Sequence, residues 1–147
     1  MEDLSLHVMD VVENSIAGGA TSVLVRVDRN SEVGLLTISI QDDGTGMSAM
    51  ESRHAIDPFY TTKDGKRIGL GLPLLRQAAA EAGGVMDVTS TPGEGTVVRA
   101  EFRLDHPDRK PLGDMEGTID LLRRYHPEVA FTLEWLEEGS REPGRME

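Results

Sequence analysis

The residues best suited to chemistry follow an alternating stretch, in the run Asp42-Asp43-Gly44-Thr45-Gly46. Leucine and isoleucine alternate with polar residues before this run, as in a half-buried strand, so Asp42 continues the apolar row. A carboxylate on that face is costly unless a hydrogen-bond donor meets it. Gly44 and Gly46 then allow a sharp turn and the close approach of a flat ligand. The run fits either a ligand-binding turn or an ordinary Asp-Gly turn at a strand end.

A second polar pair lies within residues 3–17, which have the apolar periodicity of an amphipathic helix. Asp10 and Asn14 are one helical turn apart, and His7 falls on the same polar face. Such a face is often simply solvated. Here small residues from Ala17 onward end the helix and leave room for a ligand beside Asn14.

The clearest basic cluster of the chain lies in residues 57–67, which have no apolar periodicity and are predicted to form a loop. This loop contains one aromatic residue, Phe59, and three cations, Lys63, Lys66 and Arg67. We interpret it as a lid over an anion, with ordinary solvation of the cations as the alternative.

Two glycines precede the next predicted helix, in the run Gly69-Leu70-Gly71-Leu72-Pro73. Proline suits the first turn of a helix, and free N–H groups at a helix start can bind phosphate. The motif is weak by itself. It is not the dinucleotide fingerprint, which needs a strand directly before it and a third glycine.

Thr96 opens another alternating stretch and shares its face with apolar residues, as Asp42 does. Two polar side chains that point inward at the ends of two strands indicate a shared pocket.

Apolar periodicity also predicts the elements that position these residues. The expected helices cover residues 3–17, 48–54 and 73–82, and the expected strands cover residues 23–27, 35–42, 85–90 and 96–103. The first two strands are joined by a short turn and should pair antiparallel.

The composition changes after residue 104, where a proline-bounded linker begins. A helix over residues 114–125, capped by Asp114, and a strand over residues 129–136 are predicted beyond it. That strand is expected at a sheet edge or in a contact with a partner, such as a homodimer. We therefore divide the chain into a domain over residues 1–104, a helix–strand extension over 105–138 and a disordered tail over 139–147.

The bulk composition describes an ordinary soluble chain of 147 residues with 38% hydrophobic residues and a net charge of −11. The negative charge argues against general nucleic-acid binding. No apolar run is long enough to span a membrane, and the N-terminus does not have the pattern of a signal peptide, so a cytoplasmic location is expected. The absence of cysteine excludes disulfides and thiolate chemistry.

In combination, these motifs resemble the ATP-binding domain of the GHKL superfamily, shared by gyrase-type topoisomerases, Hsp90 chaperones, histidine kinases and MutL. The helix around Asp10 and Asn14 resembles their N box, and the run from Asp42 to Met47 their G1 box. Asp57-Pro58-Phe59-Tyr60-Thr61-Thr62-Lys63 is similar to the F box of histidine kinases, Gly69 to Leu72 to the G2 box, and Gly93 to Thr96 to the last glycine box.

The resemblance covers about residues 4–104 and implies an α+β fold, the two-layer α/β sandwich called the Bergerat fold. Such a fold has a mixed, mostly antiparallel sheet with helices on one face, and ATP lies between a helix and a lid. The resemblance implies that Asn14 holds Mg²⁺ and that Asp42 accepts a hydrogen bond from the adenine amino group. It implies that Thr96 supports either Asp42 or a water molecule beside adenine. It also assigns nucleotide contacts to Ala17, Gly44, Gly46, Met47, Phe59, Lys63, Gly69, Leu70, Gly71 and Leu72.

The resemblance leaves three activities open. Relatives that hydrolyse ATP have a glutamate four residues before the asparagine, where this chain has the shorter Asp10 as the candidate catalytic residue. Histidine kinases have a phosphorylated histidine in a segment before the N box, and only six residues precede His7, so we expect the chain not to act as a complete histidine kinase. The expected function is a histidine-kinase-like protein kinase that acts on a partner protein in signalling. The alternatives are a slow ATPase or nucleotide-gated switch, and a module that binds ATP without chemistry.

Overall fold

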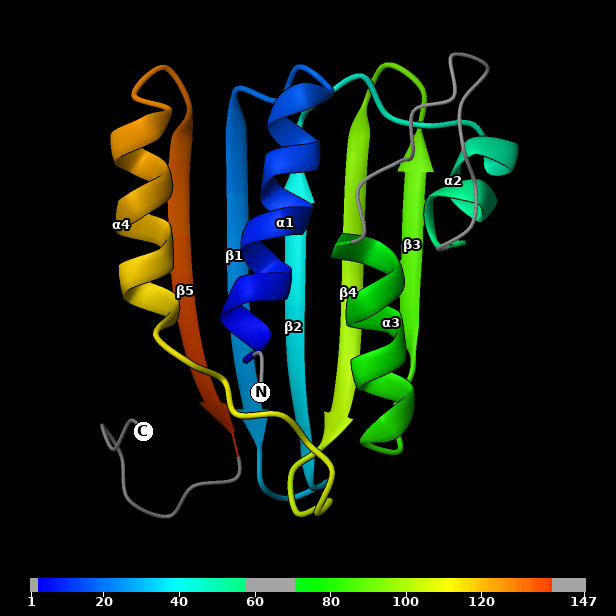
Figure 1. The fold of residues 1–147 in the computed structure, drawn as a ribbon, viewed down its shortest axis with the longest axis vertical. Coiled ribbons are helices and arrows are strands. Elements are labelled where there is room, and N and C mark those ends of the chain that lie inside the picture. Colours follow the sequence, from blue (N-terminus) through cyan, green and yellow to red (C-terminus); the bar gives the residue numbers. More distant parts are fainter. Residues whose placement is uncertain (1–2, 58–70, 139–147) are drawn as a thin grey trace.

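The computed structural model describes residues 3–57 and 71–138. Its elements in chain order are α1 (Leu4–Ala17), β1 (Ser22–Asn30), β2 (Leu35–Asp42), α2 (Ala49–Ala55), α3 (Gly71–Glu81), β3 (Met86–Thr91), β4 (Gly95–Arg103), α4 (Met115–Tyr125) and β5 (Ala130–Glu138). Figure 1 shows two layers, a sheet with α1, α3 and α4 on one of its faces. The predicted α+β class and the mixed sheet are confirmed.

The sheet has five strands in the order β3-β4-β2-β1-β5. β1 and β2 pair antiparallel as predicted, and the β2–β4 and β3–β4 pairs are also antiparallel. β5 pairs with β1 in parallel, so the segment after residue 104 adds its strand to the same sheet. In the β2–β4 ladder Asp42 lies opposite Thr96, which brings the two predicted inward polar residues together.

The core lies between the sheet and the helices and is made by alternate residues of the strands. The valines of β1 and the isoleucines of β2 are almost completely buried, as is Phe102 on β4. This alternation is the pattern expected of a sheet with one face covered and one face exposed. It fixes which side chains at the strand ends face the helices.

Helix α1 is buried over a wider arc than its apolar periodicity predicts. Asp3 caps it by accepting a hydrogen bond from the Leu6 N–H at 3.2 Å. His7, which the sequence places on a polar face, is only 3% exposed, so that prediction was wrong. The reason is that α1 lies between α3 and α4 and packs against both (Figure 1), which covers part of the polar arc.

Helix α4 matches its predicted form. The Asp114 carboxylate accepts a hydrogen bond from the Gly117 N–H at 2.9 Å, and the buried residues are Met115, Ile119 and Leu122. The apolar row of β5 faces the helix side, where Phe131 is buried and Leu133 and Trp135 are partly buried. In the described residues no helix combines the length and the hydropathy that a membrane span requires.

Candidate functional site

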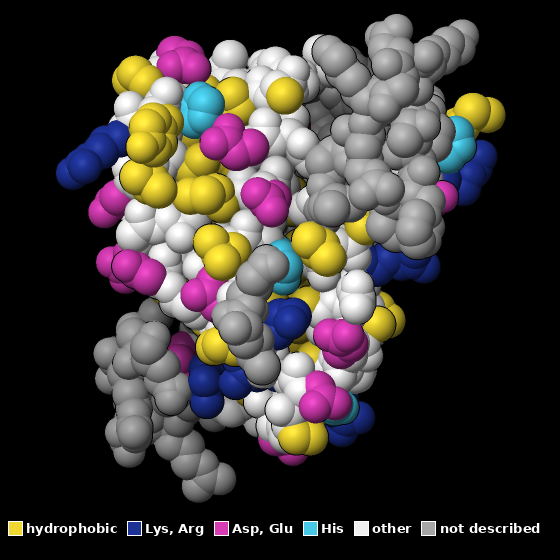
Figure 2. Space-filling model, in the orientation of Figure 1, with side chains coloured by type: hydrophobic (Ala, Val, Ile, Leu, Met, Phe, Trp, Pro, Cys, Tyr) yellow, Lys and Arg dark blue, Asp and Glu magenta, His cyan; other side chains and the backbone are white. Residues whose placement is uncertain are grey.

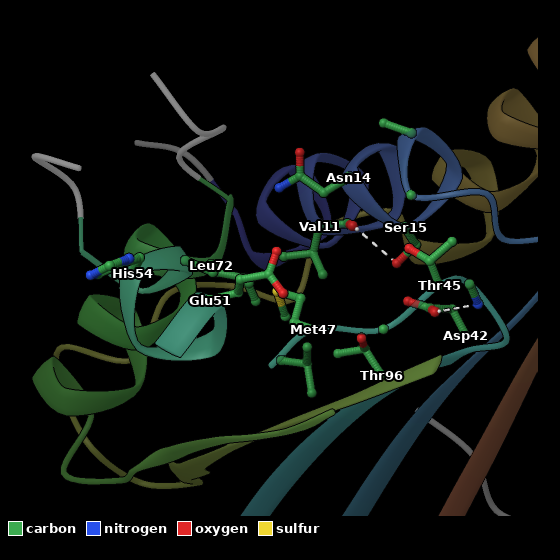
Figure 3. A pocket seen from close by; sticks show the side chains of 16 residues that line it. Val11, Asn14, Ser15, Asp42, Thr45, Met47, Glu51, His54, Leu72 and Thr96 are labelled. Carbon is green, nitrogen blue, oxygen red and sulfur yellow. Dashed lines mark hydrogen bonds between the residues drawn. The ribbon is translucent and has the colours of Figure 1, made fainter. Parts of the chain in front are cut away.

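A cavity of about 460 Å³ lies between α1, α2 and the ends of β2 and β4 (Figure 3). It collects side chains and glycines from four separate parts of the sequence. Of the candidate residues, those that line it are Asn14, Ala17, Asp42, Gly44, Gly46, Met47, Leu72 and Thr96. The shared pocket expected from the inward positions of Asp42 and Thr96 is therefore present.

Asp42 is held in the wall of this cavity by the turn that follows it. Its Oδ1 accepts a hydrogen bond from the Gly44 N–H at 2.8 Å. Its Oδ2 has no hydrogen-bond partner in the residues that the structure describes. A carboxylate oxygen on a mostly apolar wall is a strong acceptor for a ligand N–H group, because few other donors compete for it.

Ser90 joins the turn after Asp42 to the neighbouring strands. The Met47 N–H donates to Ser90 Oγ at 2.7 Å, and the Ser90 and Thr96 hydroxyls lie 2.7 Å apart. The Ser90 hydroxyl also lies 3.1 Å from the Gly95 carbonyl oxygen, to which it can donate. This network fixes the position of Met47 and the orientation of Thr96 in the cavity wall. No local pattern around Ser90 indicates this role.

Asp43 anchors the same turn from outside the cavity. Its carboxylate accepts hydrogen bonds from the Thr21 hydroxyl at 2.8 Å and from the Thr21 and Ser22 N–H groups at 2.8 and 2.9 Å. The Thr21 hydroxyl, and then these N–H groups, lower the pKa of Asp43 below its ordinary value. Asp43 thus ties the start of β1 to the end of β2.

We expect stability to fall at low pH partly through Asp43. Because the pKa of Asp43 is lower in the folded protein, its stabilisation is fully present above the unfolded pKa, about 3.9, and is lost as pH falls through the lower folded pKa. Urea unfolding between about pH 5 and pH 2 should therefore show a smaller loss of stability for Asp43→Asn than for the wild type. Equal losses in the two proteins would show that Asp43 does not contribute.

Asn14 and Ser15 contribute the α1 wall of the cavity, as Figure 3 shows. The Ser15 hydroxyl donates back to the Val11 carbonyl oxygen at 3.3 Å, so it is satisfied within the helix. Asn14 is partly exposed and reaches the cavity, which agrees with its position beside the small-residue exit of α1. It supplies the side-chain amide on this wall of the cavity.

Asp10 and Gly71 lie next to each other but do not line the cavity. A β-carbon on Gly71 would be 2.8 Å from the Val11 nitrogen and 2.9 Å from the Asp10 β-carbon, so α3 begins against the backbone of α1. The exposed Asp10 side chain therefore leaves α1 beside the start of α3. Any larger residue in place of Gly71 would separate the two helices.

Two polar cavity residues on α2, Glu51 and His54, were not among the candidates (Figure 3). Glu51 also completes the helix cap: its carboxylate accepts from the Ser48 N–H at 2.8 Å, and Ser48 Oγ accepts from the Glu51 N–H at 3.1 Å. The Ser-x-x-Glu pattern is a signal for this cap in the sequence. It does not show which way the helix faces, and so could not place either residue in the cavity.

Four candidate residues, Phe59, Lys63, Gly69 and Leu70, lie outside the described residues. Their assignments remain predictions.

The described donors and acceptors fit an adenine nucleotide. The cavity wall has a carboxylate acceptor in Asp42, glycines in the turn that follows it, and an amide oxygen on α1. Within residues 3–57 and 71–138 no cluster of His, Cys, Asp or Glu is suited to hold a metal ion. An Mg²⁺ ion held by Asn14 would take its other ligands from phosphate and water, as this ion commonly does.

Comparison with known proteins agrees with this fit. A family model described as histidine kinase-, DNA gyrase B-, and HSP90-like ATPase matches residues 2–106. The sensor histidine kinase YxdK of Bacillus subtilis is 33% identical over 44% of this chain, and the DNA mismatch repair protein MutL of Thermus thermophilus is 30% identical over 86% of it. Sporulation kinase C of Bacillus subtilis is 29% identical over 65% of the chain. The chain spans only 21% of the length of YxdK, 28% of that of MutL and 22% of that of sporulation kinase C.

Proposed function

Because the chain belongs to the family of histidine kinase-, DNA gyrase B-, and HSP90-like ATPases, we propose that it binds ATP with Mg²⁺ and transfers the γ-phosphate to a partner protein. The observation that carries the proposal is the carboxylate of Asp42, which lies opposite Thr96 in the β2–β4 ladder and lines the cavity. The protein would act in cytoplasmic signalling, as a kinase of the histidine kinase or anti-sigma kinase type. Its acceptor would be a side chain of the partner.

In this proposal the adenine ring lies against Gly46 and Met47, and its amino group donates to Asp42 Oδ2. The phosphates extend toward the start of α3, where the N–H groups of Gly71 and Leu72 bind them. Asn14 holds Mg²⁺, which supplies charge neutralisation to the phosphates when it is bound. Lys63 of the predicted lid would contact the terminal phosphate.

A slow ATPase, or a nucleotide-gated switch, is the second candidate function. It is supported by the position of Asp10, one turn before Asn14 and beside the start of α3. A carboxylate there can accept a proton from water or from an acceptor hydroxyl as either attacks phosphorus. The similarity to MutL over most of the chain is compatible with either activity.

We expect Asp10→Asn to slow both transfer and hydrolytic release of the γ-phosphate by about 100- to 10,000-fold, the usual contribution of a general base. The affinity for ATP should change little, since Asp10 does not line the cavity. The measurements are phosphate release and transfer of labelled phosphate to candidate partners, together with an ATP titration.

Asp10→Glu is the matched variant, because it keeps the carboxylate and restores the length found in hydrolysing relatives. It should release phosphate at least as fast as the wild type. If Asp10→Asn left both transfer and hydrolysis unchanged, the role of Asp10 as a base would be wrong. ATP binding could still be correct, because the titration tests it separately.

A further inference from the structure

The outer edge of β5 has backbone groups that no strand of the described chain pairs with, because β5 is last in the sheet order. The Ala130 N–H donates to the Thr21 carbonyl oxygen at 2.9 Å, on the side of β1. Successive residues of a strand turn their backbone groups to opposite sides, so those of Phe131, Leu133 and Trp135 point outward. Such a row can pair with another extended chain.

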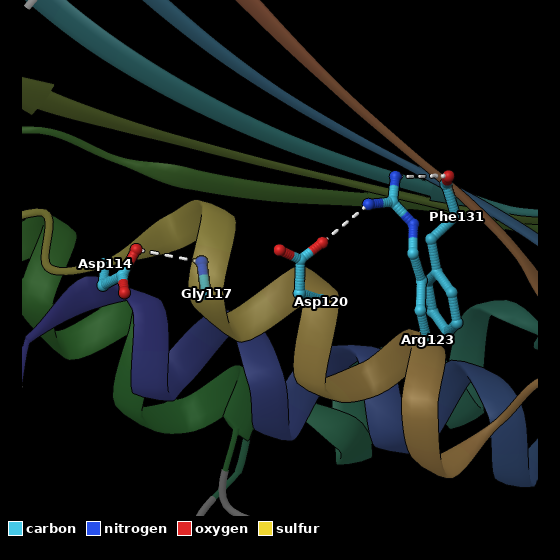
Figure 4. Close-up of polar contacts among 5 residues, drawn as sticks. All are labelled: Asp114, Gly117, Asp120, Arg123 and Phe131. Atoms are coloured by element: carbon cyan, nitrogen blue, oxygen red, sulfur yellow. Dashed lines mark hydrogen bonds and ion pairs between the residues drawn. The ribbon is translucent and has the colours of Figure 1, made fainter.

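Arg123 of α4 covers the first of these outward groups, as Figure 4 shows. Its Nη2 donates to the Phe131 carbonyl oxygen at 3.0 Å, and its Nη1 donates to Asp120 at 2.9 Å. The ion pair holds the guanidinium at this end of the edge. The outward groups of Leu133 and Trp135 lie beyond it, and no strand of the described chain pairs with them.

A groove of about 300 Å³ runs beside this edge, between α4 and β5. Its floor is apolar, formed by Ile119, Leu133 and Trp135, and its rim is charged, formed by Glu116, Asp120 and Arg123. The α4 members recur every three or four residues, so they form one face of the helix. A strand added to β5 would direct every second side chain into this groove.

We propose that this groove binds an extended, positively charged segment of a partner protein, which adds to the sheet as a strand beside β5. Apolar side chains of the segment enter the groove, and basic ones lie near Glu116 on the rim and near Glu134 on the opposite face of β5. Glu134 already forms an ion pair with Arg26 at 2.9 Å, on the side of the sheet away from the new strand.

The charge of the chain favours such a partner over a second copy. The net charge is −11, so two copies repel each other, whereas a basic segment is attracted. The groove also lies in residues 116–135, beyond the matched family segment of residues 2–106. It is therefore a site separate from the nucleotide cavity, and this proposal does not depend on nucleotide binding.

Trp135 is the single tryptophan of the chain, so its fluorescence reports on the groove directly. The probe is a capped peptide, Lys-Val-Lys-Val-Lys-Val-Lys, titrated into the full chain without nucleotide. We expect a saturable change in Trp135 emission. The same peptide N-methylated at every backbone nitrogen should give none, because it cannot donate hydrogen bonds to β5 in either strand orientation.

Glu116→Lys should weaken peptide binding by about fivefold, as expected for one charge on the rim. Asp108→Lys makes the same charge change on an exposed residue outside the groove, and should bind the peptide as the wild type does. No saturable response, an equal response to the N-methylated peptide, or equal weakening by the two variants would overturn the proposal. So would a change of emission with protein concentration alone, which would indicate a second copy in the groove.

Discussion

Asp42→Asn is expected to weaken ATP binding by about 10- to 100-fold, the loss of one buried hydrogen bond to a charged acceptor. In the wild type the Gly44 N–H donates to Asp42 Oδ1 at 2.8 Å. The carbonyl oxygen of asparagine would accept the same hydrogen bond. The side-chain NH₂ would then face the adenine amino group, so two donors would meet. The measurement is a calorimetric titration with ATP, with folding checked by denaturant unfolding.

The choice between ATP and GTP distinguishes recognition by Asp42 from a general loss of structure. Guanine has a carbonyl oxygen where adenine has its amino group. The wild type should therefore prefer ATP, and Asp42→Asn should lose that preference. Asp87→Asn removes a carboxylate from an exposed position on β3 and should leave both affinities unchanged. Wild-type affinity for ATP in Asp42→Asn would refute the assignment.

Gly46→Ala is expected to destabilise the protein strongly and to abolish nucleotide binding. Gly46 has a φ of +74°, and a β-carbon there would overlap the Thr91 carbonyl oxygen at the end of β3. The left-handed conformation costs roughly 1–2 kcal/mol for alanine, and the overlap adds roughly 1–3 kcal/mol. The measurements are the free energy of unfolding in urea and the ATP titration.

Gly93→Ala is the matched control because Gly93 has a similar φ of +82° but no atom within 4 Å of an added β-carbon. It should lose only the conformational part, about 1–2 kcal/mol. Equal destabilisation by the two substitutions would show that the contact of Gly46 with β3 is unimportant. The difference between them measures how tightly the turn after Asp42 is packed against the sheet.

The periodicity of apolar residues was sufficient to predict the helices and strands and one contact between residues far apart in the sequence. The alternation in two separate strands put Asp42 and Thr96 on the same face, and the ladder places them opposite each other. The buried residues of α4 were also correct, because a helix with three regularly spaced apolar residues has one orientation that buries them all. Here the local pattern determines the packing.

The remaining features depend on contacts between distant segments. The parallel pairing of β1 with β5 joins residues about 108 positions apart, as in the Arg26–Glu134 contact, and no local pattern specifies that register. His7 is buried because two helices flank α1. Glu51 and His54 face the cavity because of the way α2 packs, which a short capped helix does not reveal.

The most direct test of the nucleotide site is a calorimetric titration of the full chain with ATP and with ADP, each with and without Mg²⁺. The inward carboxylate and the position of Asn14 predict one nucleotide per chain, tighter ATP binding with Mg²⁺, and a much weaker response in Asp42→Asn. Absence of binding by either nucleotide, or equal binding by Asp42→Asn, would contradict the proposal that this cavity binds ATP.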